Sequence, residues 1–456
     1  MNVVILAAGM GKRMRSQYPK VLHQVAGKSM VEWVLDATEQ FAESQVIVVG
    51  HKADLVKEAL SSRPHLKFAI QKELKGTGDA VRCALDFLDL SQAYTLVCLG
   101  DVPLLSTTTI ERLYQACQGE TPTFGLITVT MPNPYGYGRI VRDAQGQVSR
   151  IVEEKDATQS EKQITEVNTG IMLLPTQMLP QWLSRLTNQN AQQEYYLTDC
   201  IQLAVQDHIP IATVSPAALE EVQGVNSPQE LAKVERFWQQ QQAQKLLENG
   251  VTLMDPSRID VRGSLICGQD VQIDVGCIFE GHVVLEDGVK VGAYCVIKDS
   301  EIARNTTILP FCHIEQAKVG MQSKVGPYSR LRPGSVLSGD NHIGNFVEIK
   351  KSTIGRATKV NHLTYLGDSE VGQRVNIGAG TITCNYDGVN KFKTIIGDDA
   401  FIGSDTQLVA PVVVGAGATL GAGTTLTKNA PEGKLTLSRV RQTTVDHWKR
   451  PTKKVD

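Results

Sequence analysis

Residues 319–344 read VGMQSKVGPYSRLRPGSVLSGDNHIG and carry an aliphatic residue at every sixth position, as at Val319, Val325 and Leu331. A period of six matches neither the 3.6-residue turn of a helix nor the alternation of a simple strand. It is typical of a solenoid with triangular coils of about 18 residues, in which each side has one short strand and one turn. We therefore predict that the aliphatic residues point inward and that glycines permit the corners.

The same period runs through most of the second half of the chain. Its one long interruption is CNYDGVNKFK (384–393), which predicts a loop that protrudes from the stack. Protruding loops on rigid scaffolds are where binding sites are usually built. Coils of this kind bury their aliphatic residues only when they are stacked, so we expect one continuous core along the axis. The repeated positions are Ile273, Phe279, Leu285, Val291, Ile297, Ile302, Ile308, Ile314, Val319, Val325, Leu331, Leu337, Ile343, Ile349, Ile354, Val360, Leu366, Val371, Ile377, Ile396, Ile402, Leu408, Val414, Leu420 and Leu426.

Up to about residue 225, strand-like apolar segments alternate with amphipathic helical ones. This alternation predicts an α/β sheet that is parallel at least in its first half. The expected strands are VVILAA (3–8), SQVIVVG (44–50), FAIQ (68–71), YTLVCLGD (94–101), TFGLITV (123–129), RIVRD (139–143), NTGIMLL (168–174) and IPIATV (209–214).

A single helix is expected between the two halves, over residues 227–250. Ser227 can cap it, Pro228 suits its first position and Glu230 completes a capping box, while Gly250 ends it. Its apolar residues make only a thin stripe among glutamines, which predicts an exposed connector. The expected domains are therefore 1–226, the connector 227–250, and 251–456 with its basic tail, for which the sequence leaves the role and the order open.

The composition is that of a globular protein that does not require nucleic acid or a membrane as a partner. The 456 residues are 42% hydrophobic and 21% charged, with a formal net charge of −2. No apolar stretch approaches the roughly 18 residues of a membrane span, and the apolar start lacks the features of a signal peptide. The nine cysteines lie singly without metal-like spacing, so we expect reduced thiols in a cytoplasmic protein.

The first expected strand runs into a glycine-spaced loop, LAAGMGKRM (6–14), that carries cations. The plain interpretation is a tight turn between a strand and a helix. The alternative is a phosphate site, because main-chain N–H groups free of bulky side chains, with Arg13 and Lys20 beyond them, suit a phosphate chain. Asp101 ends a later expected strand, where α/β sheets bind ligands. Taken alone it would be interpreted as a turn aspartate before Pro103, but the opening loop favours a ligand role.

Five segments give a specific resemblance. LAAGMGKRMRSQYPK (6–20), QKELKGTGDA (71–80), CLGDVPLL (98–105), GYGRIV (136–141) and EVNTGI (166–171) are similar to the motifs of the sugar-nucleotide pyrophosphorylases. With the solenoid, the whole chain resembles the family of bifunctional bacterial N-acetylglucosamine-1-phosphate uridylyltransferases and glucosamine-1-phosphate acetyltransferases. The resemblance implies an N-terminal Rossmann-like nucleotidyltransferase domain with a mixed sheet. It also implies a long helix and a C-terminal left-handed parallel β-helix of hexapeptide repeats.

For the first reaction, the resemblance implies uridylyl transfer from UTP to N-acetylglucosamine-1-phosphate with magnesium as cofactor. Asp101 and Asn226 would hold the metal ion, Arg13 would stabilise the transition state, and Lys20 would hold phosphate. Leu99 departs from the tyrosine that some relatives carry, so a side-chain contact there is in doubt while a backbone contact would survive. The implied UTP and UDP-N-acetylglucosamine contacts are Leu6, Ala7, Ala8, Gly9, Lys20, Gln71, Gly76, Thr77, Leu99, Gly100, Asp101, Gly138, Glu153, Asn168 and Asn226.

For the second reaction, the resemblance implies acetyl transfer from acetyl-CoA to the amine of glucosamine-1-phosphate. His362 matches the catalytic base, and we hypothesise that Glu348 orients it. Histidine suits the role because its ordinary pKa is near 6.5. The implied sugar-phosphate contacts are Arg332, Lys350, Tyr365 and Asn376, and the implied acetyl-CoA contacts are Ala379, Asn385, Tyr386, Ser404, Ala422 and Arg439.

The resemblance further implies a homotrimer through the β-helix, and a supply of precursors for peptidoglycan, lipopolysaccharide and the cell envelope. Two other interpretations remain at this stage. One is a pyrophosphorylase whose solenoid only assembles or regulates. The other is an inactive subunit that keeps the fold to bind sugar nucleotides, although such relatives usually lose the loop cations or the strand-end aspartate.

Overall fold

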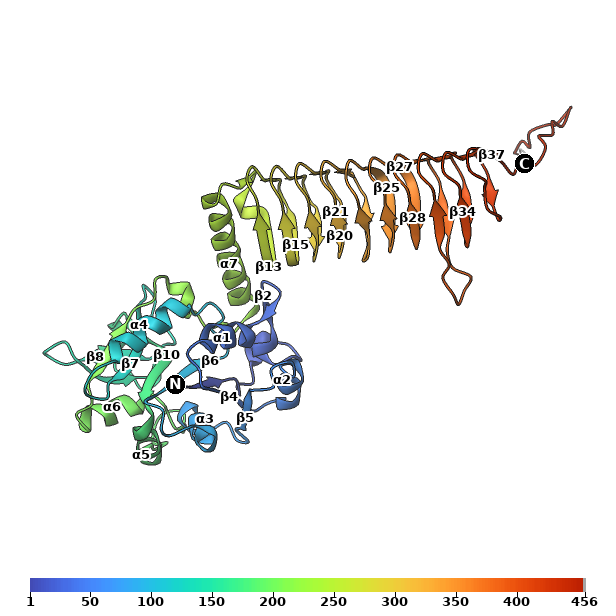
Figure 1. Ribbon diagram of the computed structural model, residues 1–456. Helices are drawn as coiled ribbons and strands as arrows, with labels where there is room; N and C mark the ends of the chain where they lie inside the picture. Colours follow the sequence, from blue (N-terminus) through green and yellow to red (C-terminus); the bar gives the residue numbers. More distant parts are fainter. Residues whose placement is uncertain (454–456) are drawn as a thin grey trace. The chain divides into compact units, whose positions relative to one another are not determined.

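The computed structural model describes residues 1–453 and divides into two units, Met1–Trp238 and Gln239–Asp456 (Figure 1). The end of the basic tail, residues 454–456, lies outside the described residues. The boundary between the units falls inside the long helix α7 (Pro228–Glu248). Among the described residues, no helix is both long and apolar enough to cross a membrane.

The first unit is a nine-stranded mixed sheet in the order β11-β7-β10-β6-β1-β4-β5, with β8 and β9 off this path. β1 pairs in parallel with β4 and β6, whereas β10 runs antiparallel to both β6 and β7. All eight expected strands are present, and β9 is one that sequence reasoning missed. The strands are β1 (Asn2–Leu6), β4 (Ser44–Val49), β5 (Lys67–Ile70), β6 (Tyr94–Leu99), β7 (Phe124–Thr130), β8 (Arg139–Arg142), β9 (Val148–Val152), β10 (Glu166–Pro175) and β11 (Ile211–Val214).

Helices cover both faces of this sheet. One buried cluster contains residues of α1, α2 and α4, and the other contains residues of α3, α5 and α6. This layering on a largely parallel sheet explains why β1 and β6 are buried along most of their length. The helices are α1 (Met30–Glu39), α2 (Ala53–Ala59), α3 (Thr77–Ala84), α4 (Thr107–Cys117), α5 (Leu179–Arg185) and α6 (Asp199–Gln206).

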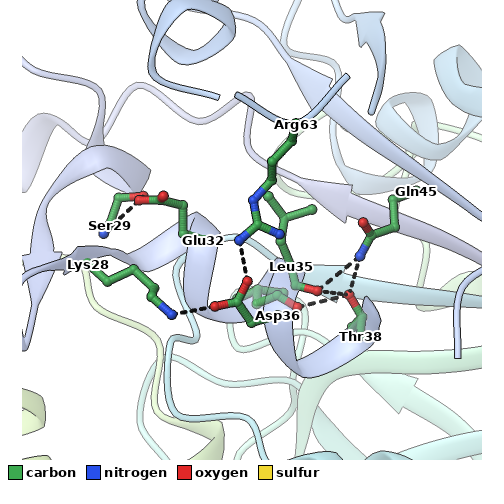
Figure 2. Close-up of polar contacts among 9 residues, drawn as sticks. Lys28, Ser29, Glu32, Leu35, Asp36, Thr38, Gln45 and Arg63 are labelled. Carbon is green, nitrogen blue, oxygen red and sulfur yellow. Dashed lines mark hydrogen bonds and ion pairs between the residues drawn. The ribbon is translucent and has the colours of Figure 1, made fainter. Parts of the chain in front are cut away.

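The start of α1 is held by a dense set of polar contacts (Figure 2). Ser29 and Glu32 form a capping box, in which the Ser29 backbone N–H donates to the Glu32 carboxylate at 3.1 Å. One turn later, Asp36 forms ion pairs with both Lys28 and Arg63. These contacts anchor the start of α1.

The second unit is a stack of parallel coils that make one 26-stranded sheet. Each coil advances 17 or 18 residues, since Ile273 pairs with Val291 and Val291 pairs with Ile308. Every repeated aliphatic position of the sequence lies in one core cluster. The unit is therefore the expected parallel β-helix of hexapeptide repeats. Its strands have two or three residues from β12 (Thr252–Leu253) to β37 (Leu435–Thr436), except the nine-residue strands β13 (Ile259–Cys267), β15 (Cys277–Leu285), β25 (His342–Lys350) and β27 (Lys359–Gly367).

The interruption at 384–393 is the loop that projects from the stack between β30 (Ile382–Cys384) and β31 (Thr394–Ile396) (Figure 1). The coil that contains it pairs Val371 with Ile396, 25 positions later. Within the loop, Tyr386 and Lys391 form an antiparallel bridge, and the Asp387 carboxylate accepts from the backbone N–H groups of Val389 and Asn390. The loop is thus a hydrogen-bonded hairpin.

Four exposed aromatic rings form a ladder along one corner of the coils, and we call it the aromatic ladder. Its neighbouring ring centroids are 5.5, 4.9 and 5.5 Å apart, with planes within 16° of parallel. Each ring is about half exposed, and Leu363 continues the line on the next coil at 63% exposed. The aromatic ladder consists of Tyr294, Phe311, Tyr328 and Phe346.

Helix α7 is more buried than the expected exposed connector. Val234 is fully buried in a cluster of the first unit that also contains Trp238, whereas Ala243 and Leu246 belong to the core of the second unit. Trp238 packs on Trp33 with ring centroids 4.4 Å apart. The apolar residues of the helix form two short patches, each serving a different core, instead of the one stripe that the sequence predicted.

Candidate functional sites

The first unit contains a cavity of about 340 Å³ beside the carboxyl ends of β1 and β6. Ligands of open α/β sheets bind at such ends because the loops that follow the strands diverge there. The lining includes ten of the expected nucleotide contacts, which come from segments far apart in the sequence. They are Leu6, Ala7, Ala8, Gly9, Lys20, Gln71, Gly76, Thr77, Leu99 and Asp101.

The opening loop leaves room for a ligand because of its glycines. A side chain at Gly9 would meet nothing within 4 Å, so the backbone there faces open space. Gly11 has a left-handed φ of +58°, and a Cβ on it would lie 2.7 Å from Cβ of Lys20. Gly11 is thus required for Lys20 to approach the loop. Arg13, in the short 3-10 helix Lys12–Met14, is exposed.

The ammonium of Lys20 lies between two oxygen ligands that were expected to hold a metal ion. It donates to the Asp101 carboxylate and, at 3.0 Å, to the side-chain oxygen of Asn226. A cation is therefore already accommodated at the point where these two oxygens converge. The donor set of one carboxylate and one amide oxygen is of the kind that magnesium prefers, with water completing its shell. No cluster of three or more His, Cys, Asp or Glu suited to a metal occurs in residues 1–453.

Asn226 reaches Asp101 because the chain returns to the sheet just before α7. The Val225 backbone N–H donates to the Asp101 carbonyl at 2.9 Å. The Glu230 carboxylate accepts a hydrogen bond from the Asn226 backbone N–H at 2.6 Å. The Ser227 hydroxyl accepts one from the Glu230 backbone N–H at 3.3 Å. Glu230 therefore reaches the residue before Ser227, instead of Ser227 itself. The helix cap therefore also positions the metal-ligand candidate.

The expected uracil contacts lie together at the start of α3. The Gln71 amide donates to the Gly76 carbonyl at 3.0 Å and to Asp79 at 3.0 Å. The Thr77 hydroxyl accepts from the Leu197 backbone N–H at 3.0 Å. Gly76 has a φ of +105° and lies so close to the Tyr195 backbone that a side chain would clash at 2.6 Å.

The expected sugar contacts Gly138, Glu153 and Asn168 also lie together, although they do not line the cavity described above. The Asn168 backbone N–H donates to the Gly138 carbonyl at 2.9 Å, and a Cβ on Gly138 would lie 3.3 Å from the Glu153 carboxylate. Burial raises the pKa of Glu153. The hydrogen bond from the Thr198 hydroxyl opposes this rise, whereas nearby carboxylates, of which Asp199 has the largest effect, add to it.

Leu99 and Gly100 occupy the end of β6. The Gly100 backbone N–H donates to the Leu6 carbonyl at 2.9 Å, which joins the two strand ends. The Leu99 side chain packs against Gly170, where a Cβ would lie 2.7 Å from it. The side chain at position 99 thus has a packing role, and its backbone remains beside the cavity.

In the second unit, four expected site residues occupy the same position in successive coils. Each of the four lies two positions after an inward-facing aliphatic residue, and these aliphatic residues pair from coil to coil: Val360 with Ile377, Ile377 with Ile402, and Ile402 with Leu420. The four residues therefore form one file along the stack. Beyond this file, the Arg439 guanidinium lies close to Gly421. The file, which we call the histidine file, consists of His362, Ala379, Ser404 and Ala422.

Three cations of the second unit gather on adjacent coils and the projecting hairpin. Arg332 and Lys350 follow the paired residues Leu331 and Ile349, so they are neighbours on adjacent coils. The ammonium of Lys391, from the projecting loop, is the main cause that lowers the pKa of Lys350, and Arg332 adds to it. Such a group of like charges suits a polyanion.

Glu348 lies elsewhere than expected. Its carboxylate accepts from Arg332 at 2.8 Å and lies 3.8 Å from Arg330. The His362 ring nitrogen Nδ1 instead faces the Asn345 side-chain oxygen at 3.1 Å. The sequence pattern does not show which side chain of β25 contacts the His362 ring. The charged residue Glu348 was therefore expected in place of Asn345, three positions earlier.

Tyr365 and Asn385 meet over Gly367. A Cβ on Gly367 would lie 2.4 Å from the Tyr365 hydroxyl oxygen and 2.8 Å from the Asn385 amide nitrogen. The Asn385 amide donates to the Asp368 carboxylate at 2.5 Å, while Tyr386 lies exposed in the hairpin. Asn376 begins β29 (Asn376–Ile377), next to Lys359 on the preceding coil.

Several residues near these sites were not predicted. Val21, Leu74, Ala80 and Glu194 line the cavity of the first unit, and Lys391 joins the cation group. Glu194 lies in a loop without strand or helix periodicity, so no local signal marked it. Lys391 could have been found, because it lies within the interruption that was expected to build a site.

Matches to protein-family models follow this division of the chain. Residues 3–163 match the MobA-like NTP transferase domain, residues 261–342 match the GMPPB C-terminal domain, and residues 393–428 match the bacterial transferase hexapeptide repeat. The fold and its two candidate sites therefore define a nucleotidyltransferase joined to a hexapeptide-repeat transferase.

Relatives extend over the whole chain. The protein named Bifunctional protein GlmU from Ralstonia pickettii is 58% identical over 454 residues, which cover 99% of each chain. Those from Cupriavidus taiwanensis and Bordetella parapertussis are 59% and 56% identical, over 99% and 100% of each chain. The chain belongs to the GlmU family of bifunctional enzymes.

Proposed function

We propose that the protein catalyses two consecutive steps of UDP-N-acetylglucosamine synthesis. The second unit transfers acetyl from acetyl-CoA to the amine of glucosamine-1-phosphate. The first unit then transfers uridylyl from UTP to the resulting N-acetylglucosamine-1-phosphate and releases pyrophosphate. One observation carries the proposal: this member of the family has a strand-end cavity beside Asp101 and Asn226 in its first unit, and both the histidine file and a group of three cations in its second unit.

Uridylyl transfer requires two anions to be aligned and their charge to be offset, with little covalent help from the protein. Backbone N–H groups of the bare loop around Gly9 suit the phosphates of UTP, and Gln71 with Gly76 suits uracil. Lys20 holds phosphate in the ground state, while Arg13 offsets the charge that develops as the sugar phosphate attacks the α-phosphorus.

Asp101 and Asn226 are the residues that would hold magnesium, as their converging oxygens and the lysine cation between them support. When bound, the ion neutralises phosphate charge. Gly224 leaves the space beside the Asp101 carboxylate free of a side chain, since a Cβ on residue 224 would lie 3.8 Å from Oδ2 of Asp101.

Acetyl transfer requires a neutral amine, because an ammonium ion has no lone pair to attack a thioester. The amine nitrogen forms a bond to the thioester carbonyl carbon, the carbon–sulfur bond breaks, and CoA leaves as a thiolate. His362 takes the proton that the nitrogen loses and returns it to the thiolate, so that the products are the amide and free CoA thiol. No acyl-enzyme is needed.

The residues after His362 suit the second substrate. Ala379, Ser404 and Ala422 have small side chains, which leave room for the narrow pantetheine arm to lie along the histidine file. Arg439 suits the phosphates of CoA. Arg332, Lys350 and Lys391 suit the phosphate of the sugar, and Asn376 and Tyr365 suit its hydroxyls.

We further propose a homotrimer that assembles through the β-helix. The aromatic ladder supports this, because contiguous exposed apolar side chains mark surfaces that a partner covers. Identical prisms that meet head to tail close into a three-membered ring when each copy is rotated by a third of a turn from the last. The hairpin at 384–393 of one copy would then help to close a site on the next. Nine unpaired cysteine thiols in residues 1–453 support a reducing, cytoplasmic location.

The proposal is tested by two assays on the purified full-length protein. With acetyl-CoA and glucosamine-1-phosphate, we expect release of free CoA thiol, and His362→Ala stops it while pyrophosphate release from UTP and N-acetylglucosamine-1-phosphate continues. Unchanged thiol release in the variant would remove His362 from its role. Absence of thiol release from the wild-type protein would favour a solenoid that only assembles or regulates.

A further inference from the structure

His362 has one side-chain partner for its ring in the described part of the chain, and it comes from the preceding coil. Asn345 in β25 pairs directly with His362 in β27, and their side chains meet at 3.1 Å between Oδ1 and Nδ1. The backbone of His362 is also held, because the Thr364 hydroxyl donates to its carbonyl at 2.7 Å. The ring therefore has a defined position along the stack.

The contact selects one form of the neutral ring. A neutral imidazole carries a hydrogen on one nitrogen and a lone pair on the other, and the hydrogen bond at one nitrogen decides which is which. An amide oxygen opposite Nδ1 requires the hydrogen there, and this leaves the lone pair on Nε2. Within residues 1–453, no protein group bonds to Nε2, so it is available to a substrate.

We propose that Asn345 is a positioning residue for acetyl transfer, which orients His362 and keeps Nε2 as the proton acceptor. The proposal rests on the acetyl transfer proposed above. Nδ1 donates to the amide oxygen before and after Nε2 takes the proton, so the ring need not turn during the reaction. Glu348 does not fulfil this role, because its carboxylate is paired with Arg332.

A neutral partner has a chemical advantage here over a carboxylate. A negative charge beside the ring would favour the protonated imidazolium, which cannot accept a proton from the amine. An amide accepts the hydrogen bond without adding charge. Asn345 thereby fixes the orientation of His362 without placing a charge beside the ring.

Two substitutions separate orientation from packing. Asn345→Leu removes the acceptor at nearly constant volume, and we expect kcat for thiol release to fall by about tenfold or more, within the range that a general base contributes. KM for acetyl-CoA and for glucosamine-1-phosphate should change little, and pyrophosphate release should remain as in the wild type. Asn345→Asp keeps an acceptor, so it should retain more activity than the leucine variant, with the acidic limb of its pH–rate profile at higher pH.

A double variant and a spectrum provide the decisive comparison. In the His362→Ala background, Asn345→Leu should cause no further loss, because it acts through the ring. In ¹⁵N spectra of histidine-labelled protein, His362 should show the Nδ1–H form in the wild type, and Asn345→Leu should lose this preference. The inference is overturned by wild-type kcat in Asn345→Leu, by losses that add in the double variant, or by an Nε2–H form in the wild type. Failure of wild-type thiol release would instead overturn the proposed function, whereas the spectra test Asn345 independently of activity.

Discussion

The ammonium of Lys20 lies against the carboxylate of Asp101 and also donates to Asn226 at 3.0 Å. Residues 20, 101 and 226 come from three distant segments, and each is brought in by local structure. Gly11 makes room for Lys20, the end of β6 presents Asp101, and the cap of α7 places Asn226. A metal ion held by Asp101 and Asn226 would compete with the lysine for the same oxygens.

The first prediction concerns Asp101→Asn, which keeps the shape of the side chain and removes its charge. We expect uridylyl transfer to fall by about two orders of magnitude, because charge stabilisation at the phosphates is lost. Calorimetry should show weaker magnesium binding. Thiol release by the second unit serves as the internal control and should be unchanged. Loss of both activities in a folded protein would contradict the two-site assignment.

The second prediction concerns the stability of Glu153→Gln. Burial raises the pKa of Glu153, so the ionised form destabilises the folded state at neutral pH. The variant should therefore unfold at a higher temperature at pH 7, and the gain should disappear as the pH falls below the ordinary pKa of glutamate. KM for N-acetylglucosamine-1-phosphate should rise at the same time, because a hydrogen-bond acceptor for the sugar is weakened.

A matched control for this variant is Glu154→Gln at the next position. The Arg139 guanidinium, bonded to Glu154 at 2.6 Å, lowers the pKa of that carboxyl group. Its replacement leaves the buried Arg139 without a counter-charge, so thermal stability at pH 7 should fall. Shifts of the same sign in both variants would contradict the assignment.

The third prediction concerns pH and the cation group. Lys391 lowers the pKa of Lys350, so Lys350 loses its proton at a lower pH than an ordinary lysine, and KM for glucosamine-1-phosphate should rise early on the alkaline side. Lys391→Gln should raise KM several-fold at neutral pH through the lost charge. It should also move the alkaline rise to higher pH, because Lys350 then keeps its proton longer.

Lys393→Gln is the control for this effect, since Lys393 lies two residues away and pairs with Glu370 at 2.5 Å. It should leave both the neutral KM and the alkaline rise unchanged. A series of KM measurements between pH 7 and pH 10 distinguishes the variants. An alkaline rise at the same pH in Lys391→Gln and the wild type would show that the two ammonium groups do not interact.

The fourth prediction concerns the aromatic ladder. Replacing Phe311 and Tyr328 by glutamate places charge in the middle of the apolar stripe, and sedimentation should show a shift from trimer to monomer. Acetyl transfer should fall with assembly, while uridylyl transfer in the first unit persists. Val205→Glu, an exposed position on α6, should alter neither property. If the glutamate variant still sediments as a trimer, the interface lies elsewhere than on the aromatic ladder.

The sequence by itself determined the two architectures. The six-residue period of the aliphatic residues predicts the coils because inward positions must recur once per side of a triangle, and the structure buries every one of them. The alternation of the first half predicts the strands of the sheet for a similar reason. The opening loop with its glycines lines the cavity of the first unit, and the break at 384–393 projects as a hairpin, as their interruption of a regular pattern predicts.

Only the tertiary structure decided which side chains meet. Lys20, Asp101 and Asn226 converge through strand order and a helix cap, and neither is encoded in local spacing. The partner of the His362 ring is Asn345 instead of Glu348, because coil register places residue 345 beside residue 362, and register depends on the lengths of the intervening turns. Periodicity specifies which residues face inward, whereas contacts among the outward-facing residues depend on how successive coils are aligned.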